Sequence, residues 1–198
     1  MNKAILKSQI RDSIRERRSL LSEEQIKEAA EVLASNVADF KDKEFVELLK
    51  SAKCVALYKA VRGELSCDGV TKYLESLGKT VCFPRVKGDT MDFYEVNDSE
   101  KDFSEGAYGV PEPKPSCKLV KPEDIDLIFV PAVAYTEEGV RLGQGGGYYD
   151  RYLNAYQYEK KPVTIGICYD FQIYSALPVE SHDRDVDFLL CVSVDNDI

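Results

Sequence analysis

The sequence predicts an α/β fold in which helices cover both faces of a mainly parallel sheet. The sheet is expected to be mixed, with one strand that could pair antiparallel. Short apolar segments rich in β-favouring residues alternate along the chain with segments of helical periodicity. One such stretch, 54–83, has the order strand, helix, strand, which is the pattern of a β-α-β unit. A length of 198 residues with 44% hydrophobic content suits a single domain, 1–198, with a sizeable core.

The opening segment 2–19 has the pattern of an amphipathic helix. Basic residues recur at every fourth position beside an apolar row: Lys3, Lys7, Arg11 and Arg15 next to Leu6, Ile10 and Ile14. The pattern alone fits a solvated basic face as well as an anion-binding one. A mitochondrial targeting helix fits less well, because Asp12 and Glu16 interrupt the basic face. The acidic balance of the whole chain favours a functional role for this stripe.

A second helix is expected to begin at Ser22. Ser22 and Gln25 form a capping-box pattern, in which each side chain can accept the backbone N–H of the other residue. Apolar residues then recur at intervals of three and four as far as Phe40, which indicates a helix face packed in the core. The segment 39–50 is compatible with a continuation after a break.

The middle of the chain alternates between strands and helices. Strands are expected at 54–58, at 80–83, where Pro84 should end the strand, and at 91–96, which should pair antiparallel. A helix is expected over 68–77, closed by Gly78. The segment 97–121 is polar, rich in Gly and Pro and too long for a plain turn, and such loops are often functional.

Three further strands and one helix are expected in the last third of the chain. The apolar runs 125–130, 162–168 and 188–192 favour buried strands, and 148–158 has the length and polarity of a helix. His182, the only histidine, lies among several carboxylates before the final strand. It could act as a general acid or base, but a lone loop histidine is more often a surface residue.

The run 136–152 holds the strongest functional signal. Four of the twelve glycines of the chain fall within five of its residues. Glycines let backbone N–H groups approach an anion closely, and the helix start that follows adds unpaired donors. Arg141 and Arg151 flank this loop and can bond phosphate oxygens, while Asp150 could hold the Mg²⁺ that accompanies a nucleoside triphosphate. The run therefore predicts a phosphate site.

Two other interpretations of the glycines fit the sequence less well. A lone G-x-G-x-G more often only makes a turn. The run also lacks the G-K-S/T ending of a P-loop and lies late in the chain, so neither that motif nor the usual dinucleotide fingerprint fits.

Composition limits the class of protein and its partners. The chain has 26 Lys and Arg against 35 Asp and Glu, a formal charge of −9, which argues against a general nucleic-acid or acidic-membrane binder. The six cysteines form no C-x-x-C pair, and Cys54, Cys82, Cys168 and Cys191 lie in apolar strand-like runs, so buried free thiols are expected and a zinc site is not. No signal peptide or spanning apolar run is evident, which predicts a cytoplasmic protein.

The glycine run resembles a known signature. Nearly letter for letter, it matches the R-L-G-x-G-x-G-Y-Y-D pattern of the 5-formyltetrahydrofolate cyclo-ligase family, also called methenyltetrahydrofolate synthetase. Some members have lysine at the position of Gly146, so a role for that lysine does not carry over. The resemblance covers nearly the whole chain, is strongest over 126–152, and is looser at the two ends and over 109–113. It implies a three-layer α/β/α, Rossmann-like fold.

The resemblance also implies roles for individual residues. An N-terminal K-x-x-x-R pair contacts the nucleotide in this family, so the ATP site comprises Lys7, Arg11, Arg141, Leu142, Gly143, Gln144, Gly145, Gly146, Gly147, Tyr148 and Tyr149. The folate site comprises Glu64, with Lys59 and Tyr148 at its border. We expect catalytic roles for Tyr148, Arg141 and Arg151, and Mg²⁺ binding by Asp150 and Asp183.

Glu64 illustrates what the resemblance adds to the pattern. It lies just past the carboxyl end of the strand expected at 54–58, where open α/β sheets collect ligand groups. From the sequence alone, an exposed loop glutamate without a specific role is the more common case. The family match favours binding of the folate.

The implied reaction is the ATP- and Mg²⁺-dependent cyclisation of 5-formyltetrahydrofolate to 5,10-methenyltetrahydrofolate, with release of ADP and phosphate. The γ-phosphoryl group would pass to the formyl oxygen, and N10 would then attack the formyl carbon. Such transfers depend on positioning and charge neutralisation more than on a protein nucleophile. The expected partners are small molecules only, possible folate polyglutamates among them, and the expected state is a monomer.

Two alternative functions place the protein in other classes, a binding module and an isomerase. A non-catalytic nucleotide or sugar-phosphate binding module would not need Glu64, Asp150 and Asp183 together. A sugar-phosphate isomerase would need a paired base that is not obvious in the sequence.

Overall fold

A computed structural model of the chain describes residues 2–106, 109–155, 161–180 and 183–194. A seven-stranded sheet lies at its centre, in the order β11-β10-β7-β1-β2-β3-β6. The strands are β1 (Cys54–Ala56), β2 (Thr80–Lys87), β3 (Thr90–Glu95), β6 (Leu119–Val120), β7 (Leu127–Val130), β10 (Val163–Tyr169) and β11 (Phe188–Val192). Pairing is parallel from β11 to β2, whereas β3 is antiparallel to both β2 and β6. The prediction of a mainly parallel, mixed sheet is confirmed.

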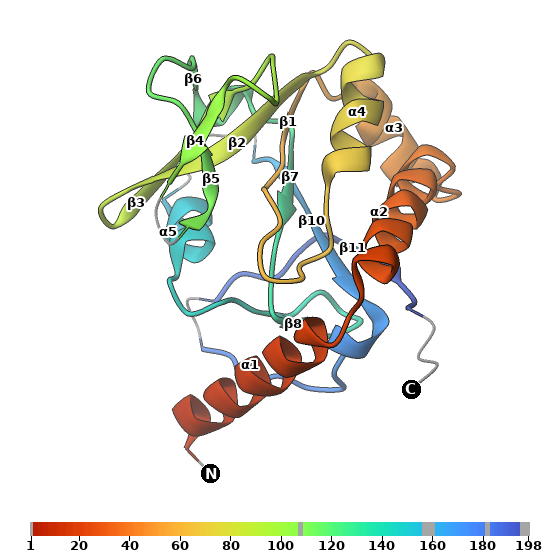
Figure 1. Cartoon of the computed structure of the whole chain (residues 1–198), viewed down its shortest axis with the longest axis vertical. Helices are drawn as coiled ribbons and strands as arrows, with labels where there is room; N and C mark the ends of the chain where they lie inside the picture. The colour runs from red at the N-terminus through yellow and green to blue at the C-terminus, as the bar shows by residue number, and fades with distance from the viewer. Residues whose placement is uncertain (1, 107–108, 156–160, 181–182, 195–198) are drawn as a thin grey trace.

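Helices cover both faces of this sheet. They are α1 (Lys3–Ser19), α2 (Glu23–Ala38), α3 (Lys43–Ser51), α4 (Asp68–Ser76) and α5 (Tyr148–Asn154). Helices α2, α3 and α4 lie together on one side, α5 lies on the other, and α1 crosses below the ends of the central strands (Figure 1). The three-layer α/β/α arrangement is therefore confirmed. Single 3₁₀ turns follow β6 and β10, at Pro122–Asp124 and Asp170–Gln172.

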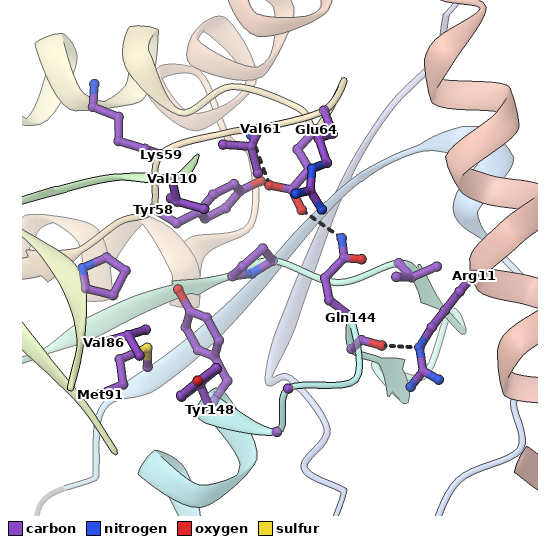
Figure 2. Close-up of a pocket in the computed structure, with 18 of the residues that line it drawn as sticks. Arg11, Tyr58, Lys59, Val61, Glu64, Val86, Met91, Val110, Gln144 and Tyr148 are labelled. Atoms are coloured by element: carbon purple, nitrogen blue, oxygen red, sulfur yellow. Dashed lines mark hydrogen bonds between the residues drawn. The ribbon is translucent and has the colours of Figure 1, made fainter. Parts of the chain in front are cut away.

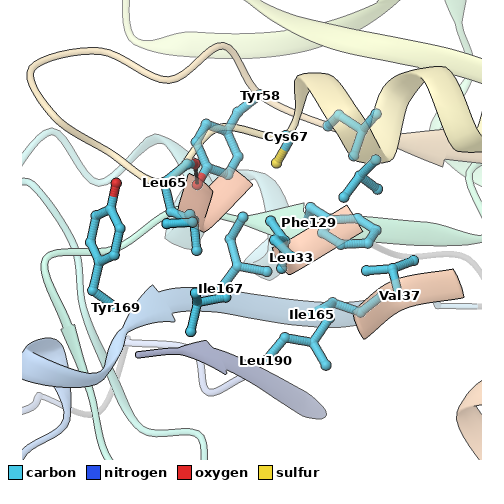
Figure 3. Packing of buried hydrophobic residues seen from close by; sticks show 14 of the residues in the cluster. Leu33, Val37, Tyr58, Leu65, Cys67, Phe129, Ile165, Ile167, Tyr169 and Leu190 are labelled. Atoms are coloured by element: carbon cyan, nitrogen blue, oxygen red, sulfur yellow. Dashed lines mark hydrogen bonds between the residues drawn. The ribbon is translucent and has the colours of Figure 1, made fainter. Parts of the chain in front are cut away.

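The core lies on both sides of the sheet. On one side, Leu33 and Val37 of α2 pack among Phe129, Ile165 and Ile167 of the central strands (Figure 3). Strands buried on both faces are expected to be continuously apolar, as β7 is. The opposite side is covered by aromatic residues of α5 that pack against β3. The two layers hold the carboxyl ends of the parallel strands in fixed positions.

Local signals at the helix ends are confirmed. Ser22 Oγ accepts the Gln25 N–H (3.1 Å) and Gln25 Oε1 accepts the Ser22 N–H (2.9 Å), so the capping box is present at the start of α2. After α4 the chain passes through Gly78 at φ +71°, a left-handed conformation that glycine adopts without steric cost.

The expected end of the second strand is wrong. Strand β2 continues through Pro84 to Lys87 and pairs there with β3. Its pairing with β1 stops at Cys82. On the side of β2 that faces β1, Pro84 therefore has no strand partner among the described residues, and proline is tolerated at such edge positions because no backbone N–H is needed there.

Two segments expected to be loops contain short hairpins. Within 97–121, β4 (Phe103–Glu105) pairs with β5 (Pro111–Pro113). Between β7 and the glycine run, β8 (Ala134–Tyr135) pairs with β9 (Arg141–Leu142). The glycine run thus joins a hairpin, and not the central strand itself, to α5. The described part of α5 ends at Asn154, and most of the remainder of the helix expected over 148–158 lies outside the described residues.

The cysteines are free thiols, with one correction to their expected burial. Cys54, Cys67, Cys82 and Cys168 are buried, whereas Cys191 is exposed. The reason is its position on β11, the edge strand of the sheet. Across the described residues, no helix combines the length and the apolar character needed to span a bilayer.

Candidate active site

A cavity of about 440 Å³ lies where β1 and β7 end. From β1 the chain continues through α4 to β2 on one side, whereas from β7 the sheet continues to β10 on the other. The strand order therefore reverses between β1 and β7, the position at which open α/β sheets bind ligands. The volume is within the range of small-molecule sites.

One end of the cavity is basic and lined by the glycine run. Arg11, Arg15 and Arg18 reach it from α1. Arg11 Nε donates to the Gly143 carbonyl oxygen at 3.0 Å, which ties α1 to the glycine run (Figure 2). The glycines of the run are needed for its shape, since Gly145 and Gly147 have φ of +106° and +66°.

The other end of the cavity is apolar. Val86 of β2 and Met91 of β3 lie there next to the ring of Tyr148, with Tyr58 and Val110 nearby (Figure 2). A wall of aliphatic and aromatic side chains suits a flat ring system. The cavity thus offers two chemically different ends to its ligands.

Glu64 lies between these two ends and is buried, at 7% exposure. Its Oε2 accepts the Val61 N–H (3.2 Å) and its Oε1 accepts an N–H from Gln144 of the glycine run (2.9 Å), as Figure 2 shows. The guanidinium of Arg18 lies 3.6 Å from Oε1. The loop glutamate is thus not exposed, and its carboxylate is held at the cavity by three separate segments.

Arg18 is a site residue that sequence reasoning missed. It is buried at 6% exposure, and its Nη2 donates to the Ala132 carbonyl oxygen at 2.8 Å. A signal was available in the sequence, because Arg18 follows Arg11 by seven residues and Lys7 by eleven. These intervals place all three on one face of a helix.

Buried Arg141 forms an ion pair with the partly exposed Asp150 at the basic end. Arg141 Nη2 lies 2.5 Å from Asp150 Oδ1, and the same oxygen accepts the Arg184 N–H at 3.1 Å. Both residues line the cavity. Asp150 therefore neutralises Arg141, a role that the sequence did not suggest.

The second expected metal ligand, Asp183, is paired elsewhere. Its carboxylate accepts Lys7 Nζ at 3.0 Å and the Glu180 N–H at 2.9 Å. Within the described ranges, no cluster of three or more His, Cys, Asp or Glu side chains could hold a metal ion. Mg²⁺ commonly uses one or two carboxylates together with substrate phosphates and water. Asp150, which lines the cavity, fits that pattern, and Asp183 has no place in the cavity wall.

Lys7 lies behind the cavity wall and binds two carboxylates. Its Nζ is 3.0 Å from both Glu180 Oε2 and Asp183 Oδ2. Burial lowers the pKa of Lys7, but the hydrogen bonds that Lys7 donates to these carboxylates outweigh this effect and raise the pKa above its usual value. Lys7 is therefore a cation at neutral pH whose charge is already neutralised.

The other residues expected in the site are distributed around it. Lys59 lines the cavity but binds Asp68 at 2.7 Å. Arg151 donates to the Asp89 carbonyl oxygen at 2.9 Å and stacks over Tyr148, outside the cavity wall. The side chain of Leu142 packs in the core. His182 lies outside the described residues.

Tyr149 contributes a buried hydroxyl group to the cavity wall. Its oxygen has no hydrogen-bond partner within the described part of the chain. Burial raises the pKa of Tyr149 well above its usual value, so the hydroxyl remains protonated at neutral pH. It is a donor that a bound ligand could satisfy.

Known proteins resemble this chain in sequence and structure. The model of the 5-formyltetrahydrofolate cyclo-ligase family matches residues 3–192. The 5-formyltetrahydrofolate cyclo-ligase of Haemophilus influenzae is 30% identical over 180 residues, 89% of this chain and 92% of that protein. The Escherichia coli K12 enzyme of the same name is 31% identical over 174 residues, 86% and 91% of the two chains.

A solved structure agrees with these matches. The NMR structure of Aquifex aeolicus 5,10-methenyltetrahydrofolate synthetase is 34% identical and superposes with a TM-score of 0.77, covering 96% of this chain and 91% of that one. With the family model matching almost the whole chain, this protein belongs to the 5-formyltetrahydrofolate cyclo-ligase family.

Proposed function

We propose that this protein is an ATP-dependent ligase that converts 5-formyltetrahydrofolate to 5,10-methenyltetrahydrofolate, with release of ADP and phosphate. One observation carries the proposal: a single cavity joins a basic end lined by glycines to an apolar end, with the buried carboxylate of Glu64 between them. A nucleoside triphosphate fits the first end and a pterin ring the second. Their reacting atoms would meet near Glu64.

The basic end acts by positioning and by charge. Arg11, Arg141 and the backbone N–H groups of the glycine run bind the phosphates and neutralise the charge that develops when the γ-phosphoryl group leaves ADP. The acceptor is the formyl oxygen of the folate. Phosphorylation turns this oxygen into a good leaving group, so N10 can attack the formyl carbon and inorganic phosphate departs. No protein nucleophile is required.

Glu64 and the two tyrosines hold the folate. The Glu64 carboxylate accepts N–H groups of the reduced pterin, and its fixed position reduces the entropy lost on binding. Tyr148 lies beside Val86 and Met91, where its ring can pack on the pterin. Tyr149 supplies a neutral donor at the junction of the two ligands. Arg151 and Lys59 act from the border of the site.

Asp150 holds Mg²⁺ on the nucleotide in this proposal, with Asp183 as a second carboxylate behind it. When bound, the ion neutralises charge on the triphosphate. Lys7, paired with Glu180 and Asp183, holds Asp183 in position next to the nucleotide end. We further propose that the chain works as a single-domain monomer in the cytoplasm, on ATP and 5-formyltetrahydrofolate, with or without extra glutamates, and without nucleic-acid or membrane partners.

The direct test is an assay of the purified protein with 5-formyltetrahydrofolate. We expect the absorbance of the methenyl product to increase only when ATP and Mg²⁺ are both present, and the increase to stop when EDTA is added. Release of one phosphate per product, measured in parallel, checks the stoichiometry. If both ligands bind and no product forms, the protein is a binding module and the proposed reaction is wrong.

A further inference from the structure

A second buried carboxylate lines the same cavity. Glu112, on β5, is 7% exposed and lies in the apolar end with Val86, Met91 and Val110. Figure 2 shows these three apolar side chains around the space opposite Gln144 and Arg11. Glu64 is hydrogen-bonded to the glycine run, whereas Glu112 belongs to the far wall of the cavity. The two carboxylates therefore mark two different places along a bound ligand.

The charge of Glu112 is not compensated by the protein. Its Oε1 accepts the Val86 N–H at 3.2 Å, and this is the carboxylate's one hydrogen bond within the described residues. No Lys, Arg or His among those residues lies within ion-pair distance of it. A buried carboxylate without a cation or a full set of donors is unfavourable. In a cavity wall, this condition indicates that the ligand supplies the missing donors.

The fold holds Glu112 in a fixed position. In the β4–β5 hairpin, Ser104 pairs with Glu112, and the Gly106 N–H donates to the Val110 carbonyl oxygen at 2.9 Å. A Cβ atom on Gly106 would lie 2.3 Å from Glu112 Cγ, so only glycine leaves room for this side chain. Arg85 Nη1 donates to the Pro113 carbonyl oxygen at 3.0 Å and ties the hairpin to β2. Such support is typical of a binding group, because it reduces the entropy lost when the ligand binds.

We propose that Glu112 is the residue that recognises the pyrimidine edge of the reduced pterin, and that it thereby determines which ligand enters the apolar end. The inference rests on the proposed function. A 2-amino-4-oxopyrimidine carries two neighbouring donors, N3–H and the 2-amino group, which match the two oxygens of a carboxylate. Adenine offers a donor next to the N1 acceptor, which a carboxylate repels. Glu112 therefore favours the pterin over the base of ATP at this end.

The variant Glu112→Gln separates recognition from structure. The glutamine carbonyl can still accept the Val86 N–H, so the hairpin should remain in place and the melting temperature should be unchanged. We expect the affinity for 5-formyltetrahydrofolate, measured by calorimetry, to fall by about ten-fold or more, because an amide cannot accept both pterin donors. The affinity for ATP should stay within about two-fold of the wild type. Glu105→Gln is the matched control, since Glu105 is exposed on the partner strand β4.

A ligand variant identifies the contact itself. In an analogue of 5-formyltetrahydrofolate with methyl in place of the 2-amino group, the wild type should lose affinity by about ten-fold. Glu112→Gln should lose little more, because the contact is already gone. If the affinity losses from the Glu112→Gln substitution and from the change in the ligand multiply when the two are combined, the inference is wrong.

The outcome also distinguishes this inference from the proposed function. If Glu64→Gln weakens folate binding and Glu112→Gln does not, the inference is wrong and the proposed function stands. If the wild type binds no reduced folate, the proposed function fails and this inference with it.

Discussion

Two ion pairs lie at the cavity, Arg18 with Glu64 and Arg141 with Asp150. Arg18 of α1 lies 3.6 Å from Glu64, and the two side chains are only 6% and 8% exposed. Arg141 pairs with Asp150, and these side chains are 2% and 17% exposed. Removal of one member of a buried pair leaves an uncompensated charge, which costs more than the pair itself contributes. Both pairs should therefore be sensitive to single substitutions.

For the first pair, we expect Arg18→Met to lower the free energy of unfolding by about 3 kcal/mol, because Glu64 and the Ala132 carbonyl oxygen both lose a buried partner. Urea denaturation measures this change. Arg17→Met is the control, since Arg17 is exposed and stacks on Phe171. Adding Glu64→Leu to Arg18→Met should restore part of the loss. If the Arg17 and Arg18 variants have equal free energies of unfolding, the Arg18–Glu64 ion pair does not contribute to stability.

In the second pair, the substitution Asp150→Asn distinguishes three possible roles of Asp150: pairing with Arg141, binding Mg²⁺ and capping α5. In Asp150→Asn the amide can still accept from Arg141, but the charge of Arg141 is left uncompensated, so we expect a loss of about 2 kcal/mol in unfolding free energy. If Asp150 also holds Mg²⁺, turnover should fall by about ten-fold or more and recover in part at higher Mg²⁺. A residue that only capped α5 would show neither change.

The magnesium dependence of turnover decides the metal role. An unshifted dependence in Asp150→Asn would exclude Asp150 as a ligand. Asp183→Asn gives the parallel test of the second carboxylate, whose described partners are Lys7 and the Glu180 N–H.

At the scale of elements, short hairpins shape the cavity. The β4–β5 hairpin places Val110, Pro111 and Glu112 in its wall, and the β8–β9 hairpin leads Arg141 into the basic end. Strands of two or three residues are too short to show a period of two, so the sequence pattern suggested only loops. The glycine run itself was recognisable, because its conformation depends on residue type at each position.

The glycine run provides a prediction with an internal control. Gly147 and Gly78 have similar φ, +66° and +71°, but only Gly147 lies in the cavity wall. Alanine at either position should cost about 1 kcal/mol of stability. We expect only Gly147→Ala to weaken ATP binding, by about ten-fold or more, because the new methyl group blocks the approach of phosphate. A Cβ atom there would meet Arg151 Nη1 at 2.8 Å, the far end of a flexible side chain that can move.

Titration calorimetry with ATP compares the two glycine variants. Normal ATP affinity in Gly147→Ala would mean that this glycine serves only the turn. Weakened affinity in Gly78→Ala, which has open space around it, would show that the effect is not local to the cavity.

At the scale of the whole molecule, the site depends on the reversal of strand order between β1 and β7. The loop after β1 places Glu64 in the cavity wall, and the chain after β7 places Pro131 and Val133 there. Helix α1 crosses below both segments, and its arginines also line the cavity. The apolar end is completed by β2, β3 and β5 from the opposite side. Each group comes from a different segment, so the chemistry of the cavity is a property of the complete fold.

The sequence by itself determined the order and type of most elements, the capping of α2, the left-handed turn at Gly78 and the conformation of the glycine run. These features are local: they depend on periodicity, on caps and on which residues tolerate positive φ. The basic stripe of α1 was visible for the same reason, although Arg18 was not included in it.

Only the tertiary structure decided the strand order, the continuation of β2 past Pro84, the two hairpins and the exposure of Cys191. It alone paired Arg18 with Glu64, Arg141 with Asp150 and Lys7 with Asp183, and it placed Glu112 in the cavity. The physical reason is that the strand order and the Arg18–Glu64 and Lys7–Asp183 pairs join residues far apart in the chain, whereas the short hairpins and the Arg141–Asp150 pair leave no periodic pattern in the sequence. The stability of these contacts depends on burial and on the low effective dielectric of the interior, which arise only when the layers pack together.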